Sequence, residues 1–143
     1  MKTTKVTADA VIIQSGKILL IKRAIPPFKG KWALPGGHIG YNEKTENAVV
    51  REVKEETGLA VKIIKLVGVY SDPKRDPRGH TVTAAYLCEP AAANRKSRAG
   101  DDASEAWWWP LDDLPDLAFD HSAIIKDAQS AIRVYRFNTY VPF

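Results

Sequence analysis

The segment "KTENAVVREVKEET", residues 44–57, constrains the fold most, because it has the pattern of an amphipathic helix. It contains no proline or glycine, and it places Val49, Val50 and Val53 on one side. It stops at Gly58, a typical residue for the left-handed end of a helix. The pattern therefore predicts a helix over 44–57 with one apolar side, which has to pack against another layer of structure.

Strand patterns lie on both sides of this helix. Upstream, "VTADAVIIQ" and "KILLIKR" are separated by Ser15-Gly16, which predicts an antiparallel hairpin. The Pro- and Gly-rich "AIPPFKGKWALPGGHIGYNE" predicts irregular backbone around a short strand at 32–34. Downstream, "VKIIKLVGVYS", "HTVTAAYLC" and "AWWWPL" read as strands, "EPAAANRKSRAGDDASE" as a long surface loop, and "FDHSAIIKDAQSAIRVY" as a second helix. This order predicts a layered α/β sandwich that forms a single domain over residues 1–143.

Composition and charge narrow the classes of function. The 143 residues are 45% hydrophobic, enough for one domain with a real core. Lys and Arg exceed Asp and Glu by 21 to 17 without a basic run, which suits an anionic small molecule and argues against nucleic acid. No apolar segment approaches the ~18 residues of a membrane span, so a cytoplasmic protein without membrane contact is expected. Cys88 is the only cysteine, which excludes an intramolecular disulfide; we expect it to fill the core.

Three glutamates gather on one face of the predicted helix. Glu52, Glu55 and Glu56 stand at i, i+3 and i+4, so their carboxylates lie within about one turn. Their repulsion would weaken an isolated helix. Clustered carboxylate oxygens suit hard divalent cations, and Mg²⁺ commonly combines a few carboxylates with water and substrate phosphates. The cluster predicts a metal platform for a phosphate substrate; the alternative is a solvated acidic face with Arg51 and Lys54 as neighbours.

The surroundings of these glutamates resemble a known motif. Residues 37–59, "GHIGYNEKTENAVVREVKEETGL", fit the Nudix box, G-x5-E-x7-R-E-U-x-E-E-x-G-U with U aliphatic, at every fixed position. The upstream "KWALPGG" and the lengths on either side also resemble a stand-alone Nudix domain. The resemblance implies a Nudix-type α/β/α sandwich with a mixed β-sheet, a loop-helix-loop metal site, and hydrolysis of a nucleoside diphosphate linked to another moiety.

The resemblance also implies a role for each matching residue. The three glutamates would bind Mg²⁺, for which Mn²⁺ is an expected substitute, and Gly37 would lie at the metal. Arg51 would orient the glutamates through ion pairs. Glu43 would brace the loop or approach the metal through water. Gly37 and Gly58 would supply backbone angles that a side chain hinders.

The general base is expected to be a carboxylate. Metals that bridge pyrophosphate oxygens neutralise charge and lower the pKa of a bound water, which then attacks in line. The base would be a box glutamate such as Glu52 or Glu55, or an acid from a loop that closes over the substrate. Among Asp101, Asp102 and Glu105, we favour Glu105, because related enzymes place an extra acid at the entry to this strand; a solvated loop acid is the alternative. The number of metals and the phosphorus attacked stay open.

The choice of substrate depends on two further stretches. "GVYSDPKRDPRGHTVTAAYL" resembles the "RDPRG" stretch of Nudix domains of the ADP-ribose pyrophosphatase type and of related ADP-ribose-sensing regulators, and "LAFDH" resembles the same group. Arg75 and Arg78 would clamp phosphate or ribose oxygens, or else brace the loop through Asp72 or Asp76. Arg23 matches a position where many relatives hold a phosphate; an exposed arginine at a strand end is the alternative.

Aromatic residues offer candidates for stacking on an adenine ring. These are Phe28, Trp32 and Tyr70, with core or rim packing as the alternative for each. The three tryptophans at 107–109 alternate faces in a strand, so an outward one would suit a homodimer interface, which many ADP-ribose-type relatives have. The three histidines are too dispersed to predict a zinc site.

Together these features predict Mg²⁺-dependent hydrolysis of ADP-ribose to AMP and ribose 5-phosphate. An alternative within the family is a MutT-like enzyme that hydrolyses oxidised nucleoside triphosphates, or an enzyme for another nucleotide sugar. An alternative of another class is a non-catalytic ADP-ribose sensor. Such regulators carry an added winged-helix segment, for which a chain ending at Phe143 leaves no room, and their boxes are often degraded, whereas this box is complete.

Overall fold

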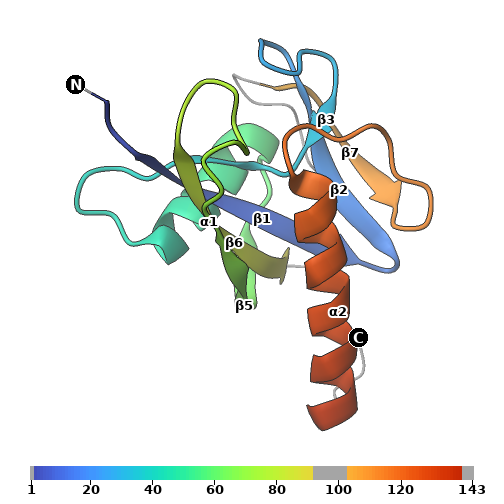
Figure 1. Cartoon of the computed structure of the whole chain (residues 1–143). Helices are drawn as coiled ribbons and strands as arrows, with labels where there is room; N and C mark the ends of the chain where they lie inside the picture. The colour runs from blue at the N-terminus through green and yellow to red at the C-terminus, as the bar shows by residue number, and fades with distance from the viewer. Residues whose placement is uncertain (1, 92–102, 140–143) are drawn as a thin grey trace.

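A mixed sheet flanked by two helices forms the framework of the chain (Figure 1). The computed structural model describes residues 2–91 and 103–139. The strands run in the order β3-β2-β1-β6-β5, with β4 also paired to β1 and β7 to β2. The elements are β1 (Lys5–Gln14), β2 (Lys17–Arg23), β3 (Trp32–Ala33), β4 (Gly36–His38), α1 (Thr45–Thr57), β5 (Val61–Tyr70), β6 (Thr81–Pro90), β7 (Ala103–Pro110) and α2 (His121–Thr139).

Strand β1 connects the two halves of the sheet. Its end pairs antiparallel with β2 through the turn at Ser15-Gly16, whose φ angles are 52° and 74°, so the predicted hairpin is confirmed. Before that end, from Lys5 to Ile12, β1 runs parallel to β6. The first half of β1 also pairs with β4, which brings the Gly36-Gly37 backbone beside the sheet.

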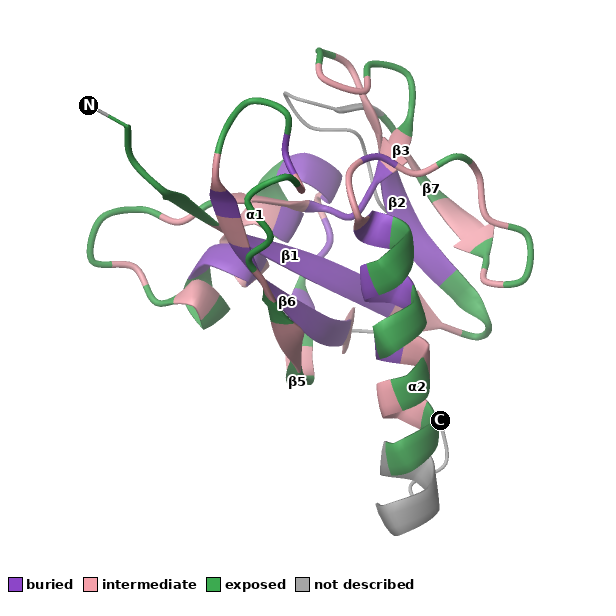
Figure 2. Cartoon of the chain, in the orientation of Figure 1, coloured by how far each residue is buried: buried purple, intermediate pink, exposed green. Residues whose placement is uncertain are grey.

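The two helices cover opposite faces of the sheet. Along β1, Ile12 packs in one apolar cluster with Val49 and Val53 of α1, while Val11 packs in another with Ile124 and Ile125 of α2. Successive side chains of a strand point to opposite faces, so this partition follows from the period of two. Figure 2 shows that most of β1 and β6 consists of buried residues. The predicted layered α/β sandwich is confirmed.

Two local predictions need correction. Residues 89–90 and 103–105, predicted as the two ends of a loop, belong to β6 and β7, because pairing with β5 and β2 gives their backbone hydrogen-bond partners. Residues 92–102 of that predicted loop lie outside the described part. Gly36–His38, predicted as irregular backbone, form the short strand β4 for the same reason.

Three smaller expectations concern single residues and the membrane. Cys88 is fully buried in the core, as predicted. Trp108 and Trp109 pack in separate clusters and Trp107 is 61% exposed, so the predicted alternation is confirmed. A homodimer interface at Trp107 stays a prediction. Within the described residues, neither helix combines the length and apolarity needed to cross a bilayer.

Candidate active site

The guanidinium group of Arg51 connects three carboxylates and a backbone carbonyl. Its Nε and Nη2 donate to the two oxygens of Glu43 at 2.8 and 2.9 Å. Its Nη1 donates to Glu52 at 2.9 Å and to Glu55 at 3.1 Å. Its Nη2 also donates to the carbonyl oxygen of His38 at 3.1 Å. A planar fork of five donors allows this, and it is the arrangement expected of a residue that orients glutamates.

Glu43 holds the loop before α1 against the helix. Besides the two bonds from Arg51, its Oε1 accepts the backbone N–H of Gly40 at 2.8 Å. The Arg51 hydrogen bonds, followed by the Gly40 bond, lower the pKa of Glu43 to about 2. Glu43 is therefore ionised at neutral pH and lies where a loop brace is expected.

The Gly36-Gly37 backbone passes directly over the carboxylates of α1. The N–H of Gly36 donates to Oε1 of Glu56 at 3.0 Å. A Cβ built on Gly37 would lie 2.5 Å from the carboxyl carbon of Glu52, so any side chain there would displace that carboxylate. Glu56 is only 7% exposed, whereas the side chain of Glu55 is 59% exposed. The three predicted ligands thus meet different environments along one face of α1.

The donor set of α1 fits a hard divalent cation. Glu52, Glu55 and Glu56 supply only oxygen atoms, and the space left by Gly37 is filled by a carboxylate. Glu52 and Glu55 both bind Arg51 here, while Glu56 turns toward Gly36. Among the described residues, no three His, Cys, Asp or Glu side chains already converge on one point.

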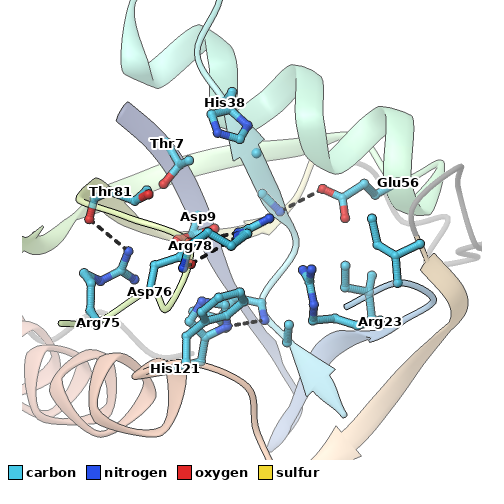
Figure 3. Close-up of a pocket in the computed structure, with 17 residues that line it drawn as sticks. Thr7, Asp9, Arg23, His38, Glu56, Arg75, Asp76, Arg78, Thr81 and His121 are labelled. Carbon is cyan, nitrogen blue, oxygen red and sulfur yellow. Dashed lines mark hydrogen bonds and ion pairs between the residues drawn. The ribbon is translucent and has the colours of Figure 1, made fainter. Parts of the chain in front are cut away.

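A pocket of about 140 Å³ opens beside Glu56 (Figure 3). Its walls come from β1, β2, β4, the 72–79 loop and the start of α2. The lining includes three arginines, Arg23, Arg75 and Arg78, which favour an anionic ligand. The fold thus places the three predicted arginines in one pocket with Glu56 of the box.

Arg75 joins the 72–79 loop to α2. Its side chain is 5% exposed, and its Nε and Nη2 bind both oxygens of Asp120 at 2.9 and 2.7 Å. Its Nη1 donates to the Thr81 carbonyl at 3.3 Å. The guanidinium thus braces the loop, and its carboxylate partner is Asp120 rather than the expected Asp72 or Asp76.

Arg78 and Arg23 approach the same aromatic ring. Arg78 binds Asp76 at 2.9 and 3.1 Å, its side chain is half exposed, and its guanidinium lies 5.7 Å from the Phe119 ring centre. The guanidinium of Arg23 lies 5.1 Å from that ring, and its Nε donates to the Pro27 carbonyl at 2.6 Å. Cation–π contact holds both arginines at the pocket wall.

Phe119 takes the place at the pocket that we expected of other aromatic residues. Within the described lining, Phe28, Trp32 and Tyr70 are not included, whereas Phe119 is. Phe28 packs edge-on against Phe119 at 4.8 Å and Trp32 against Trp109 at 5.1 Å, while Tyr70 donates to a carboxylate of α2 at 2.8 Å. The signal that could have found Phe119 is the "LAFDH" stretch that contains it.

Glu105 lies on β7 opposite Lys22 of β2. Its carboxylate is 3.8 Å from the Lys22 ammonium, and its side chain is 56% exposed. Glu105 is not part of the described pocket lining, and Asp101 and Asp102 lie outside the described residues. Its role as a general base stays a prediction.

Sequence reasoning did not predict two buried titratable residues of the pocket. Asp9 is 7% exposed and accepts the hydroxyl hydrogen of Thr83 at 2.7 Å. His121 is 4% exposed, and its Nδ1 accepts the backbone N–H of Leu34 at 3.0 Å. Burial lowers the pKa of His121, partly offset by the charge of Asp9. The available signal for Asp9 was an acidic residue inside the apolar run "ADAVII".

Known proteins are similar to this chain in sequence and in fold. The model of the NUDIX domain family matches residues 3–128. An ADP-ribose pyrophosphatase from Methanocaldococcus jannaschii is 53% identical over 122 residues, which cover 85% of this chain and 71% of that protein.

Solved structures give the same result. The NUDIX domain of Shewanella oneidensis NrtR, in complex with ADP ribose, is 30% identical with a TM-score of 0.80 and covers 92% of this chain and 90% of that one. A bifunctional NMN adenylyltransferase/ADP ribose pyrophosphatase from Francisella tularensis, in complex with AMP and a Mn ion, is 29% identical with a TM-score of 0.81; 92% of this chain covers 42% of it. The family match covers most of the chain and the fold agrees with these structures, so this chain belongs to the Nudix family.

Proposed function

We propose that this chain hydrolyses the pyrophosphate bond of ADP-ribose with Mg²⁺, giving AMP and ribose 5-phosphate. One observation carries the proposal: the box glutamates and the arginine-lined pocket meet at Gly36, whose N–H binds Glu56, itself part of the pocket lining. A diphosphate in the pocket would therefore lie next to the carboxylates. The similarity to an ADP-ribose pyrophosphatase and to an ADP-ribose-bound Nudix domain supports ADP-ribose as the substrate.

The residues of the chain divide the work. A divalent cation held by the three glutamates would neutralise the diphosphate and lower the pKa of a bound water. Arg51 keeps Glu52 and Glu55 in place, and Arg23 and Arg78 attract the negative diphosphate into the pocket. Proton removal from water would fall to the half-exposed Glu55 or, after loop closure, to a β7 acid.

Product analysis in ¹⁸O-labelled water tests the substrate. ADP-ribose and Mg²⁺ are incubated with the protein, beside a panel of nucleoside triphosphates, dinucleoside polyphosphates and nucleotide sugars. We expect AMP and ribose 5-phosphate, with ADP-ribose preferred by kcat/KM, and the labelled product identifies the phosphorus attacked. Turnover of a triphosphate with inert ADP-ribose would favour the MutT-like alternative. DNA binding without any turnover would favour the sensor.

The substitution Glu56→Gln tests the metal platform. Glutamine keeps an oxygen that accepts the Gly36 N–H, so the fold is expected to survive. The lost carboxylate should lower kcat by about 10³-fold, since metal stabilisation of developing charge is worth several kcal/mol. Glu89→Gln, at an exposed ion pair with Lys62, is the matched control and should leave kcat unchanged. Near-normal turnover by folded Glu56→Gln protein would reject the assigned role.

A further inference from the structure

The pocket contains two buried titratable side chains that the roles above do not use. Asp9 comes from β1 and His121 from the first residue of α2, and both line the pocket (Figure 3). They are 7% and 4% exposed. Buried polar groups are normally satisfied by hydrogen bonds, so any atom without a protein partner calls for an explanation.

His121 presents a hydrogen-bond donor to the pocket. Because a backbone N–H can only donate, the Leu34 bond at 3.0 Å shows that Nδ1 of His121 carries no proton. The proton of the neutral ring is therefore on Nε2. No described residue accepts a hydrogen bond from Nε2. Among the described residues, two other side-chain atoms are fully buried without a partner, and Nε2 is not one of them. It is thus a donor that is not fully buried, on a residue that lines the pocket.

Asp9 contributes a hydrogen-bond acceptor to the same pocket. Its Oδ2 accepts from Thr83 at 2.7 Å, whereas no described residue donates to Oδ1. Oδ1 lies so close to Gly36 that a Cβ on this glycine would collide with it. The backbone N–H of the same Gly36 donates to Oε1 of Glu56 at 3.0 Å. The carboxyl groups of Asp9 and Glu56 therefore flank one residue and lie within about 8 Å of each other.

A donor and an acceptor that line the same pocket fit a vicinal diol, since each sugar hydroxyl both donates and accepts. A carboxylate that accepts from a ribose hydroxyl is a recurring device in nucleotide-binding proteins. The ribose hydroxyls are on the sugar that is attached directly to the phosphate, so they lie only a few bonds from it. This matches the short distance between the carboxyl groups of Asp9 and Glu56. The base lies further away. We propose that Asp9 and His121 bind the diol of a ribose next to the scissile diphosphate and select substrates that carry it.

This inference rests on the proposed function, and the wild-type protein tests it first. Values of kcat/KM are measured for ADP-ribose and for two analogues, one lacking a hydroxyl on the adenosine ribose and one lacking a hydroxyl on the terminal ribose. We expect kcat/KM for one analogue to be lower by about 10- to 100-fold, because the missing hydroxyl leaves a buried polar group of the pocket unpaired. The sensitive position identifies which ribose is bound. Equal kcat/KM for all three compounds would overturn the proposal without any variant.

The substitution Asp9→Asn then assigns the effect to this pocket. It removes the charged acceptor while keeping the shape, so the preference for ADP-ribose over the poorer analogue should fall to about threefold or less. A purely structural role would lower both rates together and leave the preference unchanged, which would contradict the proposal. Asp116→Asn makes the same change at an exposed position and should keep the full preference.

Failure of the proposed function has a different signature. If wild-type protein leaves ADP-ribose intact, the substrate assignment is wrong, and the diol inference is then measured on the panel member that is hydrolysed, by comparing its ribose and deoxyribose forms. A preference for the ribose form that Asp9→Asn abolishes supports the diol site. Equal rates for the two forms reject it.

Discussion

The close approach of Gly37 to Glu52 makes Gly37→Ala an informative substitution. The Cβ of alanine would lie 2.5 Å from both the carboxyl carbon and Oε2 of Glu52. Ordinary contacts begin near 3.4 Å, so the carboxylate has to retreat by about 1 Å. The expectation that Gly37 supplies a backbone angle hindered for other residues is wrong, because Gly37 does not adopt a positive φ; its backbone therefore accepts alanine. The strain falls on the carboxylate and on its 2.9 Å bond to Arg51.

The expected loss is catalytic rather than structural. Misplacing a positioned group by about 1 Å costs on the order of 10²-fold in rate, or about 2.7 kcal/mol in activation free energy. Because the Glu52 side chain has flexible torsions, the free energy of unfolding should fall by only about 1 kcal/mol. Gly37→Ala should therefore remain folded while kcat for ADP-ribose falls about 100-fold and the Mg²⁺ concentration for half-maximal rate rises.

Steady-state kinetics at several Mg²⁺ concentrations and urea denaturation measure both quantities. The matched control is Gly68→Ala on β5, where the new Cβ would lie at an ordinary 3.5 Å from the Tyr70 ring. It should keep wild-type kcat and Mg²⁺ dependence. If folded Gly37→Ala protein equals the wild type in both, the Glu52 carboxylate does not need the position that Gly37 gives it, and the reasoning fails.

Three further predictions concern stability and reactivity. Asp120→Ala should lower the free energy of unfolding by about 3 kcal/mol in urea, since it leaves the buried Arg75 guanidinium without its carboxylate; a loss below about 1 kcal/mol would contradict this. Burial lowers the pKa of His121, so as pH drops below the ordinary 6.5 the unfolded chain binds a proton before the folded one does. The free energy of unfolding should therefore fall by up to about 1.4 kcal/mol per pH unit in this range. If His121→Gln showed the same dependence of unfolding free energy on pH, this explanation would be wrong. Burial raises the pKa of the Cys88 thiol to about 12, so a thiol reagent at pH 8 should react at least about 100-fold more slowly with folded than with unfolded protein; equal rates would refute its burial.

Local patterns in the sequence were enough to predict the main elements. The helix pattern, the apolar positions Val49 and Val53 and the terminal glycine all lie within fifteen residues of one another, so they specify α1 without knowledge of the fold. Gly58 ends α1 at φ 74° and donates its N–H to the Lys54 carbonyl, as the glycine predicted. The Arg51–Glu55 contact is equally local, since a helix brings residues four apart together.

Partners that are distant in sequence could not be predicted. Arg75 was expected near its own loop, yet its carboxylate is 45 residues away, at the start of α2. Phe119 reaches the pocket because the segment before α2 pairs with Trp32 of β3, which places the ring against Phe28. An arginine or an aromatic ring has many suitable partners in a chain of this length, and the packing of the layers selects one.

The sequence by itself determined the family motif, the carboxylate face of α1 and the alternation of strands and helices. Those features depend on the side-chain periodicity of helices and strands and on contacts between residues close in the sequence. The tertiary structure alone decided that Asp9 and His121, 112 positions apart, line one pocket beside Glu56. Whether a polar atom of Asp9 or His121 has a hydrogen-bond partner depends on which elements pack around it, and these elements are distant in the sequence.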